Sequence, residues 1–174
     1  MLFRRPDGAS EQWPRHDDRT VGVPLFHFTD PSEIRDVTHD WLLPKTWNHA
    51  CFDGLYRISG KGHTVRAIQI TIADTHSCKL RHLIPIAQAM NAHVVELVYV
   101  CRSSNFDGFK VPTPHHPPTS RSSDAVAEHQ QYLALMTTLQ AIRRAKKSKS
   151  TIPPSSLVVR KVCYERVGLD RPLM

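Results

Sequence analysis

The stretch TVRAIQITIA at residues 64–73 decides the fold, because apolar and other side chains alternate along it. Successive side chains of a β-strand point to opposite faces, so its three isoleucines share one face while Gln69 and Thr71 share the other. The strand-like run CFDGLYRI at 51–58 precedes it across the turn sequence SGKG at 59–62. Together the two runs predict an antiparallel β-hairpin.

Helical and strand-like runs alternate after this hairpin. Apolar residues recur at helical spacing over 77–91, and HVVELVYVC at 93–101 is a β-branched run typical of a central strand. A second helix is predicted over 124–147 and a last strand over 157–167. This order predicts an α/β fold, a small mixed sheet with flanking helices, in a single domain over 21–174.

The remaining segments carry weaker signals. Residues 1–20 are charged and show no period, so we expect them to be poorly ordered. The run 21–28 predicts a strand or an extended arm. The motif DPSE at 30–33 predicts the start of a short helix that continues to about residue 41. Residues 111–123 are rich in proline and serine and predict a loop.

The composition excludes several classes of protein. The 174 residues are 40% hydrophobic, and no apolar run approaches the roughly 18 residues of a membrane helix. No secretory signal is expected, since no apolar stretch follows the N-terminal arginines. The net charge of +7 favours DNA or another polyanionic partner. Most of the surplus lies in residues 88–174, with 12 basic and 6 acidic side chains, against 11 and 10 in residues 1–87.

The four cysteines lie far apart and form no C-x-x-C pair, so neither a zinc finger nor a disulfide framework is predicted. Cys51, Cys101 and Cys163 fall in or beside strand-like runs, where a free thiol behaves as a small apolar side chain. We therefore expect buried free cysteines and a reducing compartment.

The predicted hairpin carries the residues that could bind a metal ion or take part in catalysis. Asp53 on the first strand offers a carboxylate, Gln69 on the second offers a neutral oxygen, and the backbone carbonyl of Ile70 offers a third contact. Hard cations such as Mg²⁺ prefer these oxygen ligands, and a bound cation activates water and neutralises charge on a scissile phosphate. Spacing alone favours the alternative that Gln69 and Thr71 are polar positions on a half-exposed strand face.

The motifs FDG at 52–54 and AIQIT at 67–71, followed by His76 and Leu80, resemble a segment of the Crinkler effectors and the kinetoplastid retrotransposon hot spot proteins. In those families an aspartate strand precedes an apolar Q-x-T strand, a nearby histidine and a helix, a segment similar to the core of the restriction-endonuclease-like PD-(D/E)XK fold. The resemblance spans residues 30–101. It implies that fold and a magnesium-dependent endonuclease acting on DNA.

The resemblance also implies roles for three residues of the hairpin. Asp53 takes the place of the metal-binding aspartate, Gln69 that of the second acidic residue, and Thr71 that of the lysine. Glutamine offers an oxygen without a charge, and threonine cannot orient the water or stabilise negative charge as lysine does. Both departures bear on whether the domain still cuts DNA.

Substitutes for the missing groups lie nearby in the sequence. Lys79 and His76 are candidates for the work of the lysine, and Glu33 or Asp36 for the carboxylate that some members place on the preceding helix. The chain lacks the long N-terminal and ATPase-like regions of full-length members. We therefore expect a fragment or a divergent stand-alone copy.

Two groups of basic residues are candidates for nucleic-acid binding. Lys79 and Arg81 stand at the start of the helix expected over 77–91, where a bound phosphate would meet free backbone N–H groups, although exposed cations are also tolerated there. The second group is a run at the end of the helix expected over 124–147, which suits a helix C-terminus, phosphate binding or nuclear import. Its members are Arg143, Arg144, Lys146, Lys147 and Lys149.

Three functions remain open from the sequence. The first is a nuclease-like domain that binds DNA, in the nucleus or cytoplasm or delivered to a host cell. The second is a catalytically inactive module of the same fold that binds nucleic acid or protein. The third is a truncated reading frame without a present function.

Overall fold

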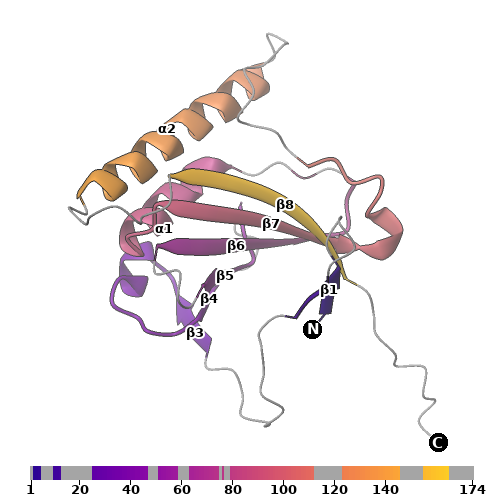
Figure 1. Ribbon diagram of the computed structural model, residues 1–174, viewed down its shortest axis with the longest axis horizontal. Helices are drawn as coiled ribbons and strands as arrows, with labels where there is room; N and C mark the ends of the chain where they lie inside the picture. The colour runs from indigo at the N-terminus through magenta and orange to yellow at the C-terminus, as the bar shows by residue number, and fades with distance from the viewer. Residues whose placement is uncertain are drawn as a thin grey trace, which may run out of the picture.

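The computed structural model describes residues 2–4, 10–12, 25–46, 51–58, 63–74, 76, 79–111, 123–145 and 155–164. One sheet has the strand order β2-β1-β8-β7-β6-β5-β4-β3 (Figure 1). Its strands are β1 (Leu2–Arg4), β2 (Ser10–Gln12), β3 (Leu25–Phe28), β4 (Trp41–Pro44), β5 (Gly54–Arg57), β6 (Thr64–Thr71), β7 (Val94–Arg102) and β8 (Ser156–Tyr164). The helices are α1 (Leu83–Ala89) and α2 (Ser123–Ala145), with 3₁₀ turns η1 (Pro31–Ile34), η2 (Leu80–His82) and η3 (Ser103–Asn105).

The predicted hairpin is confirmed. Strands β5 and β6 pair antiparallel, with Gly54 opposite Ile68 and Arg57 opposite Val65. Strand β6 then pairs parallel with β7, and β7 parallel with β8, so these three strands run side by side in one direction through the sheet (Figure 1). Parallel neighbours require crossover connections, which η2 with α1 and then α2 provide. The sheet is therefore mixed and the α/β prediction is confirmed.

The two faces of β6 carry different clusters, as the alternation predicted. Val65 and Ala67 belong to the main core, which includes Leu83 of α1 and Leu135 of α2, so we call this face of the sheet the helix-covered face. Ile68 belongs to a second cluster built from strand residues, with Val98, Val100 and Val162. We call that side the strand-only face.

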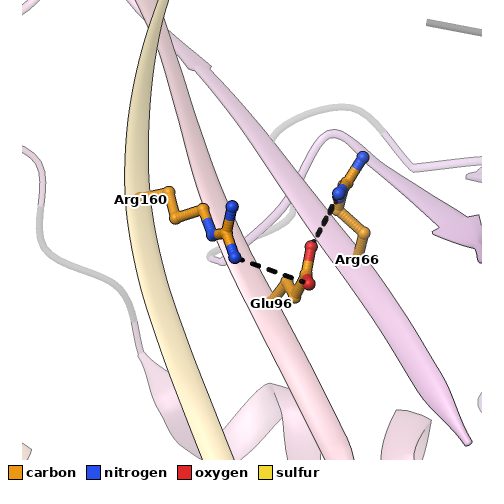
Figure 2. A network of polar contacts seen from close by, with 3 residues as sticks. All are labelled: Arg66, Glu96 and Arg160. Carbon is orange, nitrogen blue, oxygen red and sulfur yellow. Dashed lines mark hydrogen bonds and ion pairs between the residues drawn. The ribbon is translucent and has the colours of Figure 1, made fainter. Parts of the chain in front are cut away.

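An ion-pair network crosses β6, β7 and β8 on the strand-only face (Figure 2). Nε and Nη2 of Arg66 each lie 2.8 Å from Oε2 of Glu96, and both side chains are over 90% buried. Nη2 of Arg160 lies 4.0 Å from Oε1 of Glu96 and is much more exposed. The network holds three parallel strands together away from the hairpin end that carries Asp53.

The N-terminal predictions need correction. Residues 2–4 and 10–12 form β1 and β2, whereas we predicted poor order for the whole of 1–20. The physical reason is that β1 pairs with β8, more than 150 residues away in the chain, which local periodicity cannot reveal. Residues 13–20 and 21–24 lie outside the described residues.

The first predicted helix is only the 3₁₀ turn η1. Its start is as expected, with Asp30 as N-cap and Glu33 completing the capping box. Residues 41–44, where we expected the helix to end, form β4, which pairs parallel with β3. Val37 and Thr38 are β-branched residues that lower helix propensity, and strand pairing prevails beyond them.

Helix α1 is shorter than predicted, because the backbone forms η2 before it and α1 begins only at Leu83. Helix α2 and strands β7 and β8 lie where the sequence placed them. The predicted ends of α2 and β8, at 146–147 and 165–167, and residues 112–122 of the predicted loop fall outside the described residues.

The cysteine prediction is correct for Cys101, which is free and buried. It is wrong for Cys51, which is buried and disulfide-bonded. The spacing of cysteines along the chain did not reveal this bond because pairing is decided by folding. Among the helices in the described part of the chain, none combines the length and apolar character that crossing a membrane requires.

Candidate metal-binding site at the hairpin

Asp53 and Gln69 are direct neighbours across the β5–β6 hairpin. The backbone N–H of Asp53 donates to the carbonyl of Ile68 at 2.7 Å, which continues the ladder one residue beyond β5. Oδ2 of Asp53 then accepts from Nε2 of Gln69 at 2.8 Å and from the backbone N–H of Ile70 at 2.6 Å. The register of the hairpin thus brings together the three residues that the sequence predicted as metal ligands, with the Asp53 carboxylate beside the Gln69 amide and the Ile70 backbone.

Gln69 is buried, with 6% of its surface exposed, and so is Thr71. Both lie on the helix-covered face, while the isoleucines beyond the middle of β6 are the exposed ones, Ile70 at 63% and Ile72 at 69%. The alternative that Gln69 and Thr71 occupy a half-exposed face is therefore wrong. Burying an amide is costly unless its polar atoms are hydrogen-bonded, so Gln69 needs a physical reason to be there.

The amide of Gln69 is satisfied on one side only. Its nitrogen faces Oδ2 of Asp53 and, at 3.5 Å, the carbonyl oxygen of Ile70. Its oxygen Oε1 is buried and has no hydrogen-bond partner within the part of the chain that the structure describes. An orphaned acceptor of this kind costs about 1–3 kcal/mol.

The same residues fit a hard cation. Rotating the terminal amide of Gln69 by half a turn exchanges its oxygen and nitrogen. Oε1 would then face Oδ2 of Asp53 and the carbonyl of Ile70, and three converging oxygens repel each other unless a cation lies between them. Mg²⁺ takes such oxygen ligands and keeps several of its waters, so one carboxylate is sufficient.

The described residues contain no group of three or more His, Cys, Asp or Glu side chains that suits a metal ion. The candidate site therefore depends on one carboxylate, one amide and one backbone carbonyl. This donor set suits Mg²⁺ or Mn²⁺ and does not suit the sulfur- and nitrogen-rich coordination that Zn²⁺ prefers.

Thr71 and His76 are engaged in other contacts near this site. The hydroxyl of Thr71 accepts a hydrogen bond from the backbone N–H of Ala73 at 3.1 Å, which turns the chain at the end of β6. The ring of His76 lies edge-on to the ring of Tyr99, with centroids 6.2 Å apart. Thr71 is thus a strand-end residue, and His76 packs beside the site against β7.

Lys79 precedes η2 and Arg81 lies within it, and both residues are exposed. Within the described residues, no hydrogen bond or ion pair joins the Lys79 side chain to Asp53 or Gln69. The backbone N–H of Arg81 donates to Oε1 of Gln131 on α2 at 3.2 Å, so one N–H that we expected to face a phosphate is occupied. Burial, followed by the charges of Arg81 and Lys79, lowers the pKa of His82, which disfavours a third cation there.

The two upstream carboxylates have different surroundings. Oε1 of Glu33 accepts from the backbone N–H groups of Thr29 and Asp30, at 3.3 and 3.0 Å, and so caps η1. Asp36 is exposed just beyond that turn. The carboxylate of Glu33 is thus used to cap η1. Among the described residues, no contact joins Asp36 to the hairpin.

The basic run lies far from the hairpin site. Arg143 and Arg144 are exposed in the last turn of α2, and Lys146, Lys147 and Lys149 lie outside the described residues. Helix α2 connects the end of β7 to the start of β8, so its last turn lies at the opposite end of the parallel strands from Asp53 (Figure 1). At about 1.5 Å per residue, Arg143 is about 22 Å along the helix from Glu128.

Sequence reasoning missed Tyr99 and Lys161, which share a row of the sheet with Gln69. Gln69 pairs with Tyr99 on β7, and Tyr99 pairs with Lys161 on β8. Nζ of Lys161 donates to the carbonyls of Phe106 and Phe109, at 2.7 and 3.4 Å, and lies over the Phe106 ring. Tyr99 brings a polar hydroxyl into the apolar run at 93–101, and this was the sequence signal that could have singled it out. That Tyr99 and Lys161 lie in one row with Gln69 is known only from the strand register.

Comparison with known proteins adds nothing to this geometry: no family model, no curated protein and no solved structure matches the chain.

Proposed function

We propose that this chain is a nuclease-like domain of the Crinkler and retrotransposon hot spot type, with a restriction-endonuclease-like core that binds DNA. The observation that supports this proposal is the placement of Asp53, Gln69 and Ile70. Across adjacent antiparallel strands, the Asp53 carboxylate contacts the amide of Gln69 and the backbone N–H of Ile70, and that amide lies 3.5 Å from the Ile70 carbonyl. The order β5, β6, α1, β7 also agrees with the order of elements that the resemblance implies.

The proposed cofactor is Mg²⁺, held by the Asp53 carboxylate, the Gln69 amide oxygen and the Ile70 carbonyl. When bound, such an ion supplies a Lewis acid for a phosphodiester and lowers the pKa of its water. Asp53 contributes the one formal negative charge of the three ligands. Its hydrogen bond from the Ile70 N–H fixes one carboxylate oxygen beside Gln69, so the position of the carboxylate is set before any ligand binds.

A catalytically inactive module of the same fold is the second candidate, and one observation favours it. The position expected to carry the lysine holds Thr71, whose hydroxyl is engaged with Ala73. Lys79 stands on the exposed surface, and the ammonium of Lys161 is held by two carbonyls of the segment that follows β7. Among the described residues, no hydrogen bond or ion pair therefore joins a cationic side chain to Asp53 or Gln69, where a positive group would stabilise the developing charge on phosphate.

Binding to DNA or another nucleic acid is proposed from charge. The +7 surplus provides long-range attraction, and contacts to phosphates weaken steeply with salt. Arg143 and Arg144 are exposed in the last turn of α2, and Lys79 and Arg81 are also exposed, with the backbone of Arg81 bound to Gln131 in the first half of that helix. A nuclear or cytoplasmic location, including delivery to a host cell, belongs to the same proposal.

A plasmid-nicking assay tests the enzymatic form of the proposal. Purified wild type, Asp53→Ala and the exposed-carboxylate control Asp36→Ala are incubated with supercoiled DNA, with Mg²⁺ or Mn²⁺ and with chelator. Metal-dependent nicking by wild type and Asp36→Ala but not by Asp53→Ala supports the enzyme. Equal traces of nicking in all three proteins indicate contamination and refute it.

The binding form makes a different prediction in a gel-shift or fluorescence assay. DNA retention that falls with salt and survives Asp53→Ala, without nicking by any variant, supports the inactive module. If wild type neither nicks nor retains DNA at low salt, both forms are refuted.

A further inference from the structure

A row of cross-strand neighbours runs along the strand-only face, and it combines aromatic with charged side chains. Its members are register partners across six strands, so each side chain stands next to the following one on the same face. From β3 to β8 they are Leu25, Trp41, Tyr56, Arg66, Glu96 and Val158. Two rings and an ion pair therefore lie in one line across the sheet.

The aromatic part of the row is a pair of half-buried rings. Trp41 and Tyr56 pack on the cluster of the strand-only face, with their ring centroids 5.0 Å apart and the rings inclined at 47°. Two large apolar side chains of the same face are exposed, Leu25 next to Trp41 at 48% and Ile70 on β6 at 63%. Apolar surface left in water beside polar groups is typical of a binding surface.

The charged part of the row carries a surplus positive charge. Glu96 shares its single carboxylate between Arg66, at 2.8 Å, and Arg160, at 4.0 Å (Figure 2). The charge of the buried Arg66 is matched by Glu96, whereas the side chain of Arg160 is 43% exposed. A guanidinium has five N–H donors in a planar fork that fits two oxygens of a phosphate. Arg160 therefore presents a cation suited to phosphate at the surface of this face.

Rings and an exposed arginine on one sheet face fit an unpaired nucleic-acid strand. Bases stack on aromatic side chains, and arginine binds the phosphates between them. A duplex fits less well, because its bases are stacked on one another and its major groove admits a helix or a two-stranded ribbon but not a broad sheet. From β4 to β8 the face spans four strand spacings, about 19 Å, which is room for more than one nucleotide.

We propose that the strand-only face binds single-stranded DNA, with bases on Trp41 and Tyr56 and a phosphate on Arg160. This inference rests on the proposed binding of DNA and names the form of the DNA and the surface that holds it. Ile70 links this surface to the hairpin site, since its side chain lies on the strand-only face while its backbone N–H donates to Asp53. Along β6, Ile70 is about 13 Å from the row at Arg66, so a strand of a few nucleotides reaches the hairpin.

The test is fluorescence polarisation with the whole chain, in chelator so that no probe is cut. The probes are a DNA strand of about 15 nucleotides, its duplex, and the RNA strand of the same sequence. We expect wild type to bind the DNA strand more tightly than the duplex. Trp41→Leu and Tyr56→Leu should each weaken this binding by roughly tenfold, because leucine stays apolar but has no ring face, whereas Trp41→Phe should bind nearly like wild type.

Arg160→Gln tests the phosphate contact separately and should lower the salt slope of single-strand binding by about 0.7. Two matched controls should leave single-strand affinity and salt slope unchanged. Phe26→Leu removes a half-buried ring of β3 that packs on the opposite face of the sheet, and Arg35→Gln removes an exposed cation at the end of η1. If a leucine variant melts well below wild type, the exposed Arg160→Gln decides for the proposal or against it.

The outcomes distinguish this inference from the proposed function. If wild type binds duplex as tightly as single strand, and Trp41→Leu, Tyr56→Leu and Arg160→Gln bind like wild type, the inference is overturned and DNA binding stands. Tighter binding of the RNA strand overturns the choice of DNA. If sedimentation shows a wild-type dimer that Trp41→Leu dissociates without loss of DNA binding, the face joins two copies of the chain and the inference is overturned. If wild type binds no probe at low salt, the proposed DNA binding fails and takes this inference with it.

Discussion

Replacing Gln69 with glutamate probes the hairpin site most directly. In the wild type, Nε2 of Gln69 donates to Oδ2 of Asp53 at 2.8 Å, at a position only 6% exposed. Gln69→Glu has almost the same shape but sets two carboxylates at hydrogen-bonding distance. At an effective dielectric constant of about 20, two unit charges about 3 Å apart repel by about 5–6 kcal/mol.

Protonation limits this penalty. A protonated carboxyl can donate to Asp53 as the amide does. A carboxyl group with an unperturbed pKa of about 4.3 costs about 1.4 kcal/mol to protonate for each pH unit above that pKa. At pH 7 this cost is about 3.7 kcal/mol. Because this is less than the repulsion, the folded variant takes up the proton. The expected loss in free energy of unfolding at pH 7 is therefore about 3–4 kcal/mol.

The sign of the pH dependence follows from this uptake. The pKa of the introduced carboxyl is raised in the folded state, so the penalty is absent below the unfolded pKa of about 4.3. It grows above that value by about 1.4 kcal/mol per pH unit, until the group ionises in the folded protein. At pH 5 the loss should be only about 1 kcal/mol.

Urea denaturation at pH 5 and pH 7, in chelator and with millimolar Mn²⁺, measures both effects. The control Gln130→Glu makes the same charge change at an exposed position of α2 and should stay within about 0.5 kcal/mol of wild type. A cation between the two carboxylates removes the repulsion, so Mn²⁺ should restore much of the loss. Wild-type stability in chelator at pH 7 would refute the Asp53–Gln69 contact. A pH-dependent loss that no divalent cation reduces would refute the metal site alone.

Three further predictions concern the sheet, the core and the basic helix end. Glu96→Ala removes the carboxylate beside the buried guanidinium of Arg66 and should lower the free energy of unfolding, measured by urea denaturation, by about 3–5 kcal/mol. Arg160→Ala should lower it by under about 1 kcal/mol, because Arg160 lies 4.0 Å from Glu96 and its side chain is 43% exposed. Equal losses would contradict the geometry of the network. Leu139→Ala on α2 should cost about 2–5 kcal/mol, against under about 1 kcal/mol for the exposed Leu133→Ala; a reversed order would mean that α2 packs by another face. Replacing Arg143 and Arg144 with glutamine should weaken DNA binding uniformly across sequences and lower the salt slope by about 2, measured by fluorescence titration at several salt concentrations; an unchanged slope would exclude this helix end from the DNA contact.

Local patterns predicted the central elements well. The alternation at 64–73 predicts a strand reliably because a strand with two different faces needs that pattern whatever surrounds it. The β-branched run at 93–101 does so because a strand buried on both faces needs apolar residues throughout. The pairing of Asp53 with Gln69 followed from the hairpin, since a short turn leaves little freedom of register. The same logic failed at 41–44 and 2–4, where strands form by pairing with distant partners.

The candidate site shows the same difference between what local sequence determines and what tertiary structure decides. Sequence alone determined which residues of the hairpin carry oxygen ligands, that Gln69 and Thr71 share a face, and that the chain carries a positive surplus beyond residue 87. Only the tertiary structure decided that this face is the one covered by helices, and that Gln69 is buried with half of its amide unpaired. Only the structure placed Tyr99 beside Gln69, while it left Lys79 on the surface and the last turn of α2 at the far end of the sheet. The reason is physical: periodicity acts between neighbours in the chain, whereas burial and strand register are set by packing between segments that are far apart in it.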